Sequence, residues 1–359
     1  MDIKEKIKKL PSSPGVYLMK DSADTIIYVG KSKNLRSRVG SYFVNSKSHS
    51  PKVIKLVKNL KNFDCMLTDT EFEALLLECK LIKEIKPAYN RQMKSPKTYC
   101  YIKIEMDEKY PAIEICNETN NSDGKIYFGP YTNKNTVEKG LYAIKEHSNI
   151  LCTNISRKAS GCLKYSMNMC IGMCTANPSV ENYFAIVEKV KKLLSGTDLT
   201  ILEEMEHKMN IAATNFNFEG AAKYRDNIRA VKHLTNAAKI INFIEVNKNI
   251  ALIEFLNNKE FKLFLIRYNK LLFSDRFKIQ QKFKCNFISH FHSDFTDSTN
   301  IGKNEIDEVH IIYNYLKSKE STCKYISIPE KWIEDMDRLR IDRAIYEFIK
   351  SNLQLNNYT

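Results

Sequence analysis

The first hundred residues alternate between short stretches with a two-residue apolar period and longer stretches with a helical period. Residues 15–19 and 25–29 are rich in aromatic and β-branched side chains and flank the polar turn 21–24, so they predict a β-hairpin. Residues 64–68 predict a third strand. Helical spacing covers residues 35–43, 54–60 and 70–86. We therefore expect a small α/β domain with a three-stranded antiparallel sheet over residues 10–92.

Beyond the first hundred residues, stretches with strand-like alternation and stretches with helical spacing follow one another, which predicts an α+β protein with several domains. Strand-like alternation covers residues 99–105, 112–116, 251–255, 261–268 and 271–273. Helical spacing covers residues 136–148, 180–194, 331–352 and, in two arms separated near 215–218, residues 199–234. We divide this part into a linker with a cysteine-rich region at 96–195, a helical hairpin at 199–235, and an α/β segment at 240–359 that is a remnant or a scaffold.

Composition narrows the class of protein. The 359 residues include 56 Lys and Arg against 42 Asp and Glu, a formal charge of +14, and 43% are hydrophobic. That apolar content supports folded cores, and the length corresponds to two or three domains of roughly 150 residues. Because no apolar run approaches ~18 residues and the start of the sequence lacks an apolar signal region, we expect a cytoplasmic chain without a membrane span. The charge favours nucleic acid as a partner, although a generally lysine-rich proteome would produce the same excess.

Polar side chains with a shared chemistry gather around the predicted hairpin. Tyr17 and Tyr28 lie on neighbouring strands, where their phenol oxygens can reach one face. Arg38 and Tyr42 are four residues apart on the first helix and therefore share a face, and Lys31 lies just beyond the second strand. This predicts two cations and two or three phenols at one site. Phosphodiester hydrolysis needs an activated water and cations on developing charge, so we interpret Tyr28 as the general base or relay, its pKa lowered by Lys31 and Arg38.

The long predicted helix adds carboxylates to this site. Glu71 and Glu78 are seven residues apart and share a face. A single carboxylate among basic residues suits Mg²⁺, which keeps several waters and accepts substrate oxygens. Glu73 is a competitor for Glu78, but its five-residue offset puts it on a different face, so it ranks second.

These residues stand in motifs that resemble a known nuclease family. Gly15-Val16-Tyr17 is followed after ten residues by Tyr28-Val29-Gly30, and the continuations Gly30 to Arg38, Glu73 to Glu78 and Pro87 to Asn90 keep the same order. The set resembles GIY-YIG nucleases in the form found in the UvrC subunit of bacterial nucleotide excision repair, with Val in place of Ile in both tripeptides. The resemblance implies that Glu78 is the ligand of Mg²⁺ or Mn²⁺, that Lys31, Arg38 and Tyr42 face phosphate, that Asn90 positions the site, and that Tyr17 is part of it.

Four cysteines form a second candidate site. Cys152, Cys162, Cys170 and Cys174 are separated by nine, seven and three residues. Four thiolates suit an iron–sulfur cluster or tetrahedral Zn²⁺, and the absence of Cys-x-x-Cys pairs favours the cluster. The block resembles the cysteine-rich region of UvrC, which implies a 4Fe–4S cluster. Four incidental buried thiols are the remaining alternative.

The helical hairpin at 199–235 resembles the UVR motif, through which UvrB and UvrC associate. Leu202, Met205 and Met209 mark an apolar stripe, and Phe216 and Phe218 occupy the bend. Two helices alone bury little, so we expect an exposed Met and Phe face that binds a UvrB-like partner. The alternative is that this face packs on the same chain.

Together these features predict a metal-dependent DNA endonuclease that makes a single incision in nucleotide excision repair. The second nuclease domain and the helix-hairpin-helix module of UvrC are expected to be missing, since residues 240–359 hold no matching carboxylate motif. Two alternatives stay open at this point: a stand-alone GIY-YIG nuclease acting on branched or foreign DNA, and a non-catalytic DNA-binding adaptor. The intact tyrosine, cation, Glu78 and Asn90 set argues against the adaptor.

Overall fold

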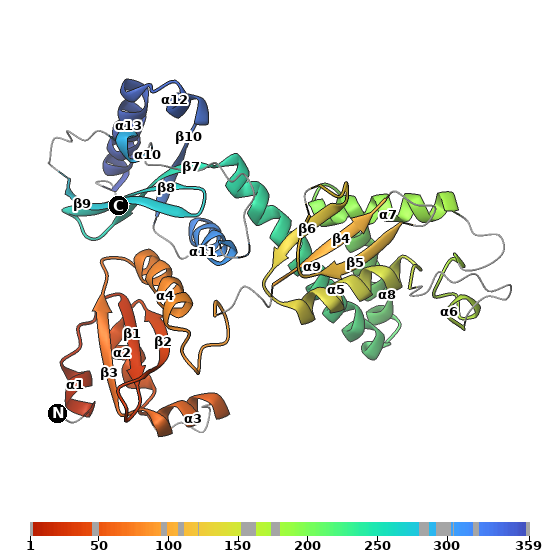
Figure 1. The fold of residues 1–359 in the computed structure, drawn as a ribbon, viewed down its shortest axis with the longest axis horizontal. Coiled ribbons are helices and arrows are strands. Elements are labelled where there is room, and N and C mark those ends of the chain that lie inside the picture. Colours follow the sequence, from red (N-terminus) through yellow and green to blue (C-terminus); the bar gives the residue numbers. More distant parts are fainter. Residues whose placement is uncertain are drawn as a thin grey trace. The chain divides into compact units, whose positions relative to one another are not determined.

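The structure is a computed structural model, and the chain separates into two compact units (Figure 1). Unit 1 contains Met1–Pro96 together with Phe243–Asn300 and Asn304–Thr359, and unit 2 contains Lys97–Asn242 with Ile301–Lys303. The residues described are 3–44, 50–94, 99–106, 111–120, 122–151, 163–173, 180–279, 287–291, 303, 305–318 and 323–356.

The N-terminal part of unit 1 is built on a three-stranded antiparallel sheet, as predicted. Its strands are β1 (Gly15–Lys20), β2 (Ile26–Ser32) and β3 (Asn62–Leu67). The order β2-β1-β3 leaves β2 as an edge strand.

Helices cover both faces of this sheet because side chains alternate along β1. The helices are α1 (Ile3–Lys8), α2 (Leu35–Ser41), α3 (Pro51–Asn59) and α4 (Glu71–Ile85). Tyr17 and Met19 belong to a core shared with residues of α2 and α3, whereas Val16 and Leu18 share a second core with α4. Tyr17 therefore points away from the face that α4 covers, which fixes the side of the sheet on which the phenols gather.

Unit 2 combines a second three-stranded sheet with helices (Figure 1). The strands β4 (Cys100–Glu105), β5 (Ala112–Cys116) and β6 (Ile126–Tyr131) pair in the order β5-β4-β6. The helices are α5 (Lys134–His147), α6 (Leu163–Ser166), α7 (Val180–Ser195), α8 (Thr200–Thr214) and α9 (Phe218–Val246). Strand β6 was not predicted because its Gly129-Pro130 pair is a sequence signal for a turn.

Helices α8 and α9 form the predicted hairpin, but its apolar stripe is not a free surface. Leu202 and Met205 are 5% and 1% exposed and lie in the core of unit 2, with Met209 packed against that core. The expectation of an exposed Met face was therefore wrong for these residues. Exposed apolar surface remains at the bend, where Phe216 and Phe218 are 80% and 67% exposed.

The C-terminal part of unit 1, called here the C-terminal domain (residues 247–356), is an antiparallel sheet with helices. Its strands are β7 (Asn249–Phe255), β8 (Glu260–Arg267), β9 (Lys270–Lys278) and β10 (Lys324–Ile328), in the order β10-β7-β8-β9. Its helices are α10 (Ile288–Phe291), α11 (Ile306–Lys317), α12 (Glu330–Glu334) and α13 (Arg338–Asn356). One core joins β7, β8 and β9 to α10, α12 and α13. The predicted helix at 331–352 is broken, because Met336 has a left-handed backbone (φ 54°) between α12 and α13.

Strand β10 and helix α11 were not predicted from the sequence. Across the parts of the chain that the structure describes, no helix is long and apolar enough to cross a membrane.

Candidate active site

Three tyrosines meet on the face of the N-terminal sheet that α2 covers. The Tyr17 and Tyr42 hydroxyls are 2.8 Å apart and share a hydrogen bond. The Tyr17 ring lies 6.1 Å from the Tyr28 ring and 5.9 Å from the Tyr42 ring, measured between centroids. The Arg38 guanidinium lies 5.1 Å from the centre of the Tyr42 ring, as expected for residues four apart on one helix. The predicted convergence of phenols and a cation is therefore present.

Tyr17 and Tyr28 are held neutral rather than ionised. Burial raises the pKa of both Tyr17 and Tyr28 well above the usual value for tyrosine, and neighbouring Tyr42 raises both further. Arg38 acts in the opposite direction on both, but its effect is smaller. The expectation that cations lower the Tyr28 pKa was thus wrong in its net sign, because the loss of hydration on burial outweighs the nearby charge.

Gly30 is required by the packing of the tyrosines. A side chain at Gly30 would collide with the ring and hydroxyl of Tyr17 on the paired strand. The final glycine of Tyr28-Val29-Gly30 therefore makes room for the phenol of its register partner on β1.

The free edge of β2 is covered by two polar side chains. Val29 and Lys31 are two residues apart on β2, so their backbone N–H groups point in the same direction, in the plane of the sheet and away from β1. The buried Asn90 side chain accepts a hydrogen bond from the Val29 N–H (3.0 Å) and donates one to the Val29 carbonyl (2.9 Å). Glu78 Oε1 accepts a hydrogen bond from the Lys31 N–H (3.1 Å). Asn90 and Glu78 thus hold the strand segment that follows Tyr28.

Three glutamates in the first half of α4 differ in the groups that they contact. Glu71 pairs with Lys31 and Lys33 at 2.5 and 3.0 Å. Glu73 closes a capping box with Thr70 at the first turn of α4. Glu78 has no salt bridge within the described residues, and the Lys31 N–H is its hydrogen-bond donor. Among the residues that the structure describes, Glu78 alone of the three keeps a carboxylate oxygen without a hydrogen bond or ion pair, which favours Glu78 over Glu73 as the ligand of a cation.

Glu78 fits the requirements of a divalent cation ligand. Burial raises the pKa of its carboxyl, although the Lys31 backbone and the charges of Lys31 and Arg38 lower it. A partly buried carboxylate that is short of positive charge gains from a bound cation. One carboxylate with room for waters and substrate oxygens is the coordination that Mg²⁺ accepts.

Sequence reasoning missed one cation at this site. The Lys52 ammonium on α3 lies 5.6 Å from the centre of the Tyr28 ring, within the range of a cation–π contact. Lys52 follows Tyr28 by 24 residues, on another element, so neither periodicity nor motif spacing relates the two. Only the Pro51 start of α3 is a local signal, and it indicates a helix rather than a site.

Three regions of the chain match known protein families. Residues 13–91 match the UvrC-like GIY-YIG domain, residues 99–193 match the UvrC/Cho excinuclease middle domain, and residues 200–234 match the UvrB/uvrC motif. The three matches follow one another along the chain in this order.

The chain is similar to proteins of the UvrC family across three successive regions. It is 36% identical to UvrABC system protein C of Clostridioides difficile over 347 residues, which is 92% of this chain and 57% of that protein. It is 37% identical to UvrABC system protein C of Acetivibrio thermocellus over 92% of this chain and 55% of that protein. The chain thus spans somewhat more than half the length of these relatives.

Solved structures of a UvrC nuclease domain also match. The GIY-YIG N-terminal endonuclease domain of UvrC from Thermotoga maritima, bound to magnesium, is 34% identical, with a TM-score of 0.23, over 25% of this chain and 100% of that chain. A point mutant of the same domain bound to the catalytic divalent cation matches over 26% of this chain at the same identity and TM-score.

The predicted cluster site falls mostly outside the described residues. Cys152, Cys162 and Cys174 lie outside them. Cys170 is 4% exposed, and its Sγ accepts a hydrogen bond from the Gly172 N–H at 3.5 Å. Within the described ranges, no group of three or more His, Cys, Asp or Glu side chains is arranged to hold a metal ion.

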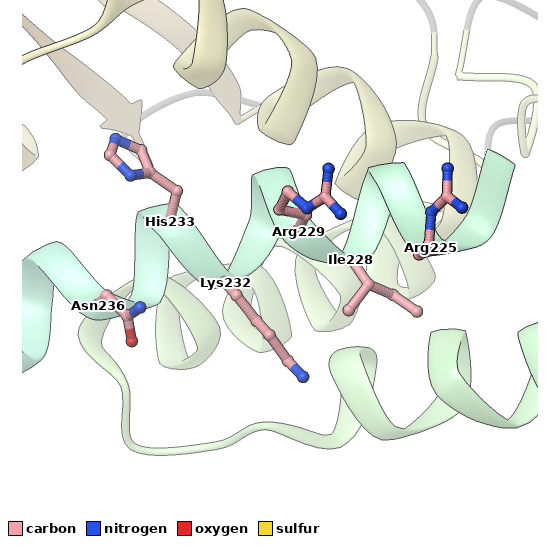
Figure 2. Close-up of a pocket in the computed structure, with 6 residues that line it drawn as sticks. All are labelled: Arg225, Ile228, Arg229, Lys232, His233 and Asn236. Atoms are coloured by element: carbon pink, nitrogen blue, oxygen red, sulfur yellow. The ribbon is translucent and has the colours of Figure 1, made fainter. Parts of the chain in front are cut away.

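A shallow pocket lies along α9, in the part of the chain that matches the UvrB/uvrC motif. Figure 2 shows its six lining residues: Arg225, Ile228, Arg229, Lys232, His233 and Asn236. Its cations have acidic neighbours, since Lys232 pairs with Glu206 at 2.7 Å and Arg225 with Asp226 at 2.9 Å. The pocket contains none of the predicted site residues.

Proposed function

We propose that this chain is a metal-dependent DNA endonuclease that hydrolyses one phosphodiester bond in nucleotide excision repair. The observation that carries the proposal is the convergence of Tyr17, Tyr28, Tyr42 and Arg38 beside Glu78 on one edge of a small sheet. The family match supports the same reaction. The adaptor alternative is disfavoured because DNA binding alone does not require the buried Tyr17–Tyr42 hydroxyl pair or a carboxylate such as Glu78 that can bind a cation.

The proposed roles follow from chemistry and position. Arg38 and Lys31 would contact phosphate oxygens and stabilise the charge that develops on them. Tyr28, neutral at physiological pH, would accept the proton of the attacking water while its own hydroxyl proton passes to a phosphate oxygen of the DNA, so that the phenol acts as a relay and ends the step neutral. Tyr17 and Tyr42 would orient Tyr28, and Asn90 would hold the strand that carries it.

Glu78 would hold Mg²⁺ or Mn²⁺ through its carboxylate. When bound, the cation would polarise the phosphoryl and leaving oxygens. The magnesium bound to the domain of Thermotoga maritima supports this assignment.

The decisive experiment is nicking of a defined lesion-bearing duplex by the purified chain with Mg²⁺ or Mn²⁺, with and without UvrB. We expect a single nick that is abolished by Glu78→Ala and by Tyr28→Phe, while DNA binding is largely retained. Lys278→Met is a matched control, because Lys278 is an exposed cation on β9. Unchanged cutting by both site variants would contradict the assignment of the site.

The same assay separates the alternatives. Cleavage of branched DNA without UvrB, and none of the lesion duplex, would identify a stand-alone nuclease. DNA binding with no cleavage under any of these conditions would identify an adaptor.

We propose that residues 199–235 bind a UvrB-like partner through the bend of the hairpin. The match to the UvrB/uvrC motif and the exposed Phe216 and Phe218 rings, whose centroids are 6.3 Å apart, support this. The double variant Phe216→Ser, Phe218→Ser should lose UvrB in an equilibrium binding assay. Ile211→Ser, at a half-exposed site on α8, serves as the comparison. Equal affinity of the double variant and the unmodified chain would refute the proposal.

We propose that Cys152, Cys162, Cys170 and Cys174 hold a 4Fe–4S cluster. The match of residues 99–193 to the UvrC/Cho middle domain supports this, and Zn²⁺ is the alternative occupant. Anaerobically purified protein should show visible absorbance that Cys170→Ala removes. Stoichiometric Zn²⁺ without iron would contradict the cluster.

The proposed division of labour follows the predicted regions: nuclease at 10–92, cluster-binding linker at 96–195, partner binding at 199–235, and scaffold at 240–359. An enzyme that incises chromosomal DNA would work in the bacterial cytoplasm.

A further inference from the structure

Helix α4 has a second face that contacts the C-terminal domain. One side of α4 carries Glu71 and Glu78, which contact Lys31 on β2. The residues on its other side pair with β8, β9 and α11, far along the chain. The two faces belong to the same helix, so what holds one face also sets the position of the other.

At the N-terminal end of α4, a buried lysine joins two carboxylates. Lys262 on β8 is 8% exposed, and its ammonium lies 2.7 Å from Asp69 and 2.6 Å from Glu73. Ser274 donates a hydrogen bond to Glu73 at 3.2 Å, and Arg276 pairs with Asp69. Because Glu73 is also the N3 residue of the capping box that Thr70 begins, these contacts fix the first turn of α4 against β8 and β9.

An aromatic contact continues the interface along the helix. Phe72 is fully buried, with its ring centroid 5.2 Å from that of Phe264 on β8 and 4.9 Å from that of Tyr315 on α11. The near-perpendicular arrangement of Phe72 and Phe264 (84°) is the edge-to-face geometry that aromatic pairs favour.

The C-terminal half of α4 has its own ion pair with α11. Lys83 lies 2.5 Å from Glu308 and 3.6 Å from Asp307. The Cys79 thiol donates to the same Glu308 at 3.6 Å. The C-terminal domain therefore contacts α4 at both ends and at the middle.

We propose that the C-terminal domain is a brace that positions α4, and through it Glu78, for the nuclease reaction, with Lys262 as the central positioning residue. This inference rests on the proposed function. The N-terminal domain has a hydrophobic core of its own on each face of its sheet, so the contribution we assign to the brace is to turnover rather than to folding of the nuclease domain. A displacement of about 1 Å at a catalytic group is enough to cost roughly 100-fold in rate.

The substitution Lys262→Met tests the brace, since it keeps most of the side-chain volume and leaves Asp69 and Glu73 facing each other without their shared cation. Two readouts are needed: nicking kinetics of the full chain, and hydrogen exchange of the backbone amides of α4. We expect kcat to fall by at least tenfold with little change in KM, faster exchange in α4, and unchanged exchange in β1. Lys262→Arg should restore most of the loss, and Lys278→Met on β9 should match the unmodified chain.

The possible outcomes distinguish a failure of the brace hypothesis from a failure of the proposed nuclease function. Nicking and exchange that both stay unchanged would overturn the brace, and so would faster exchange with unchanged nicking, because α4 would then loosen without consequence for the site. If the unmodified chain fails to nick any substrate, the proposed function fails and the positioning role is overturned with it, while the exchange data still decide whether the contact holds α4. Should Lys262→Met not fold, Ser274→Ala and Arg276→Gln remove other partners of the same carboxylates and give the same test.

Discussion

Two of the aromatic clusters in this chain, one in the N-terminal domain and one at the bend of the helical hairpin, differ in burial and in hydrogen bonding. Tyr17, Tyr28 and Tyr42 are buried or partly buried, and cations lie over the rings of Tyr28 and Tyr42. Phe216 and Phe218 project from the bend between α8 and α9 and are mostly exposed. A ring that is buried with its hydroxyl hydrogen-bonded is held in one orientation, as chemistry requires. An exposed ring without a polar tip gains free energy only when another surface covers it.

The difference teaches how to separate a reaction site from a contact surface before any ligand is known. In the tyrosine cluster, substitution should change both activity and stability, because each phenol is also part of the core. At the bend, substitution should change binding alone. The following predictions test that separation, from the largest expected effect to the smallest.

Gly30→Ala should have the largest effect. The new Cβ collides with the Tyr17 ring and hydroxyl, and Tyr17 is 1% exposed and has nowhere to move. We expect a rate loss of about 100-fold from displacement of the phenols and a stability loss of about 1–3 kcal/mol from overpacking. Nicking kinetics and urea unfolding measure the two. Gly40→Ala, where a side chain would meet only a methyl group at 3.7 Å, is the control.

Removing one hydroxyl of the Tyr17–Tyr42 pair should destabilise the fold. Tyr17→Phe leaves the buried Tyr42 hydroxyl without this partner, which costs about 1–3 kcal/mol. The double variant Tyr17→Phe, Tyr42→Phe should recover much of that loss, because no lone hydroxyl remains. Urea unfolding of the unmodified chain, the two single variants and the double variant provides a double-mutant cycle. Strictly additive losses would show that the hydrogen bond contributes nothing.

Replacing the phenylalanines at the bend should change the stability of the chain very little. Phe216→Ser and Phe218→Ser remove exposed rings, so the free energy of unfolding should change by no more than about 0.5 kcal/mol. Urea unfolding in the absence of a partner makes the measurement. A loss as large as that of Tyr17→Phe would mean that the bend is part of a core, and the contrast between the clusters would fail.

The smallest effect concerns alkaline pH. Burial raises the pKa of Tyr17 above the ordinary value of about 10 that it has in the unfolded chain. A raised folded pKa contributes stability that is fully present below the unfolded pKa and is lost as pH rises through the folded pKa. Stability should therefore begin to fall above about pH 10, and Tyr17→Phe should make that fall shallower. Urea unfolding midpoints measured between about pH 8 and about pH 11 would test this, and parallel curves for the two proteins would contradict it.

Much of the N-terminal domain was predictable because its signals are local. Alternation in β1 and β2 and the four-residue spacing of Arg38 and Tyr42 each depend on a few neighbouring residues. The same locality explains one of the failures, because strand β6 contains a Gly-Pro pair that normally marks a turn. Helix α11 is different: Ile306, Val309, Ile312 and Leu316 repeat at helical spacing, so a local signal for this helix was present in the sequence.

The chemistry of the site was predictable in its residue types and not in its electrostatics. Cations near Tyr28 were expected to lower its pKa, but burial dominates and raises it. Burial depends on how α2, α3 and the sheet close around the phenol, and a sequence motif carries no measure of that closure.

By itself, the sequence determined the sheet of the N-terminal domain, the set of polar side chains around it and the similarity to the UvrC family. Each of these follows from residue type and short-range spacing along the chain. Only the tertiary structure decided that Asn90 and Glu78 cover the free edge of β2, that Lys52 lies over Tyr28, and that Lys262 pairs with Asp69, 193 residues earlier and just before α4. The physical reason is that these contacts join elements whose separation in sequence carries no period, so they exist only once the chain has folded and the edges and faces meet.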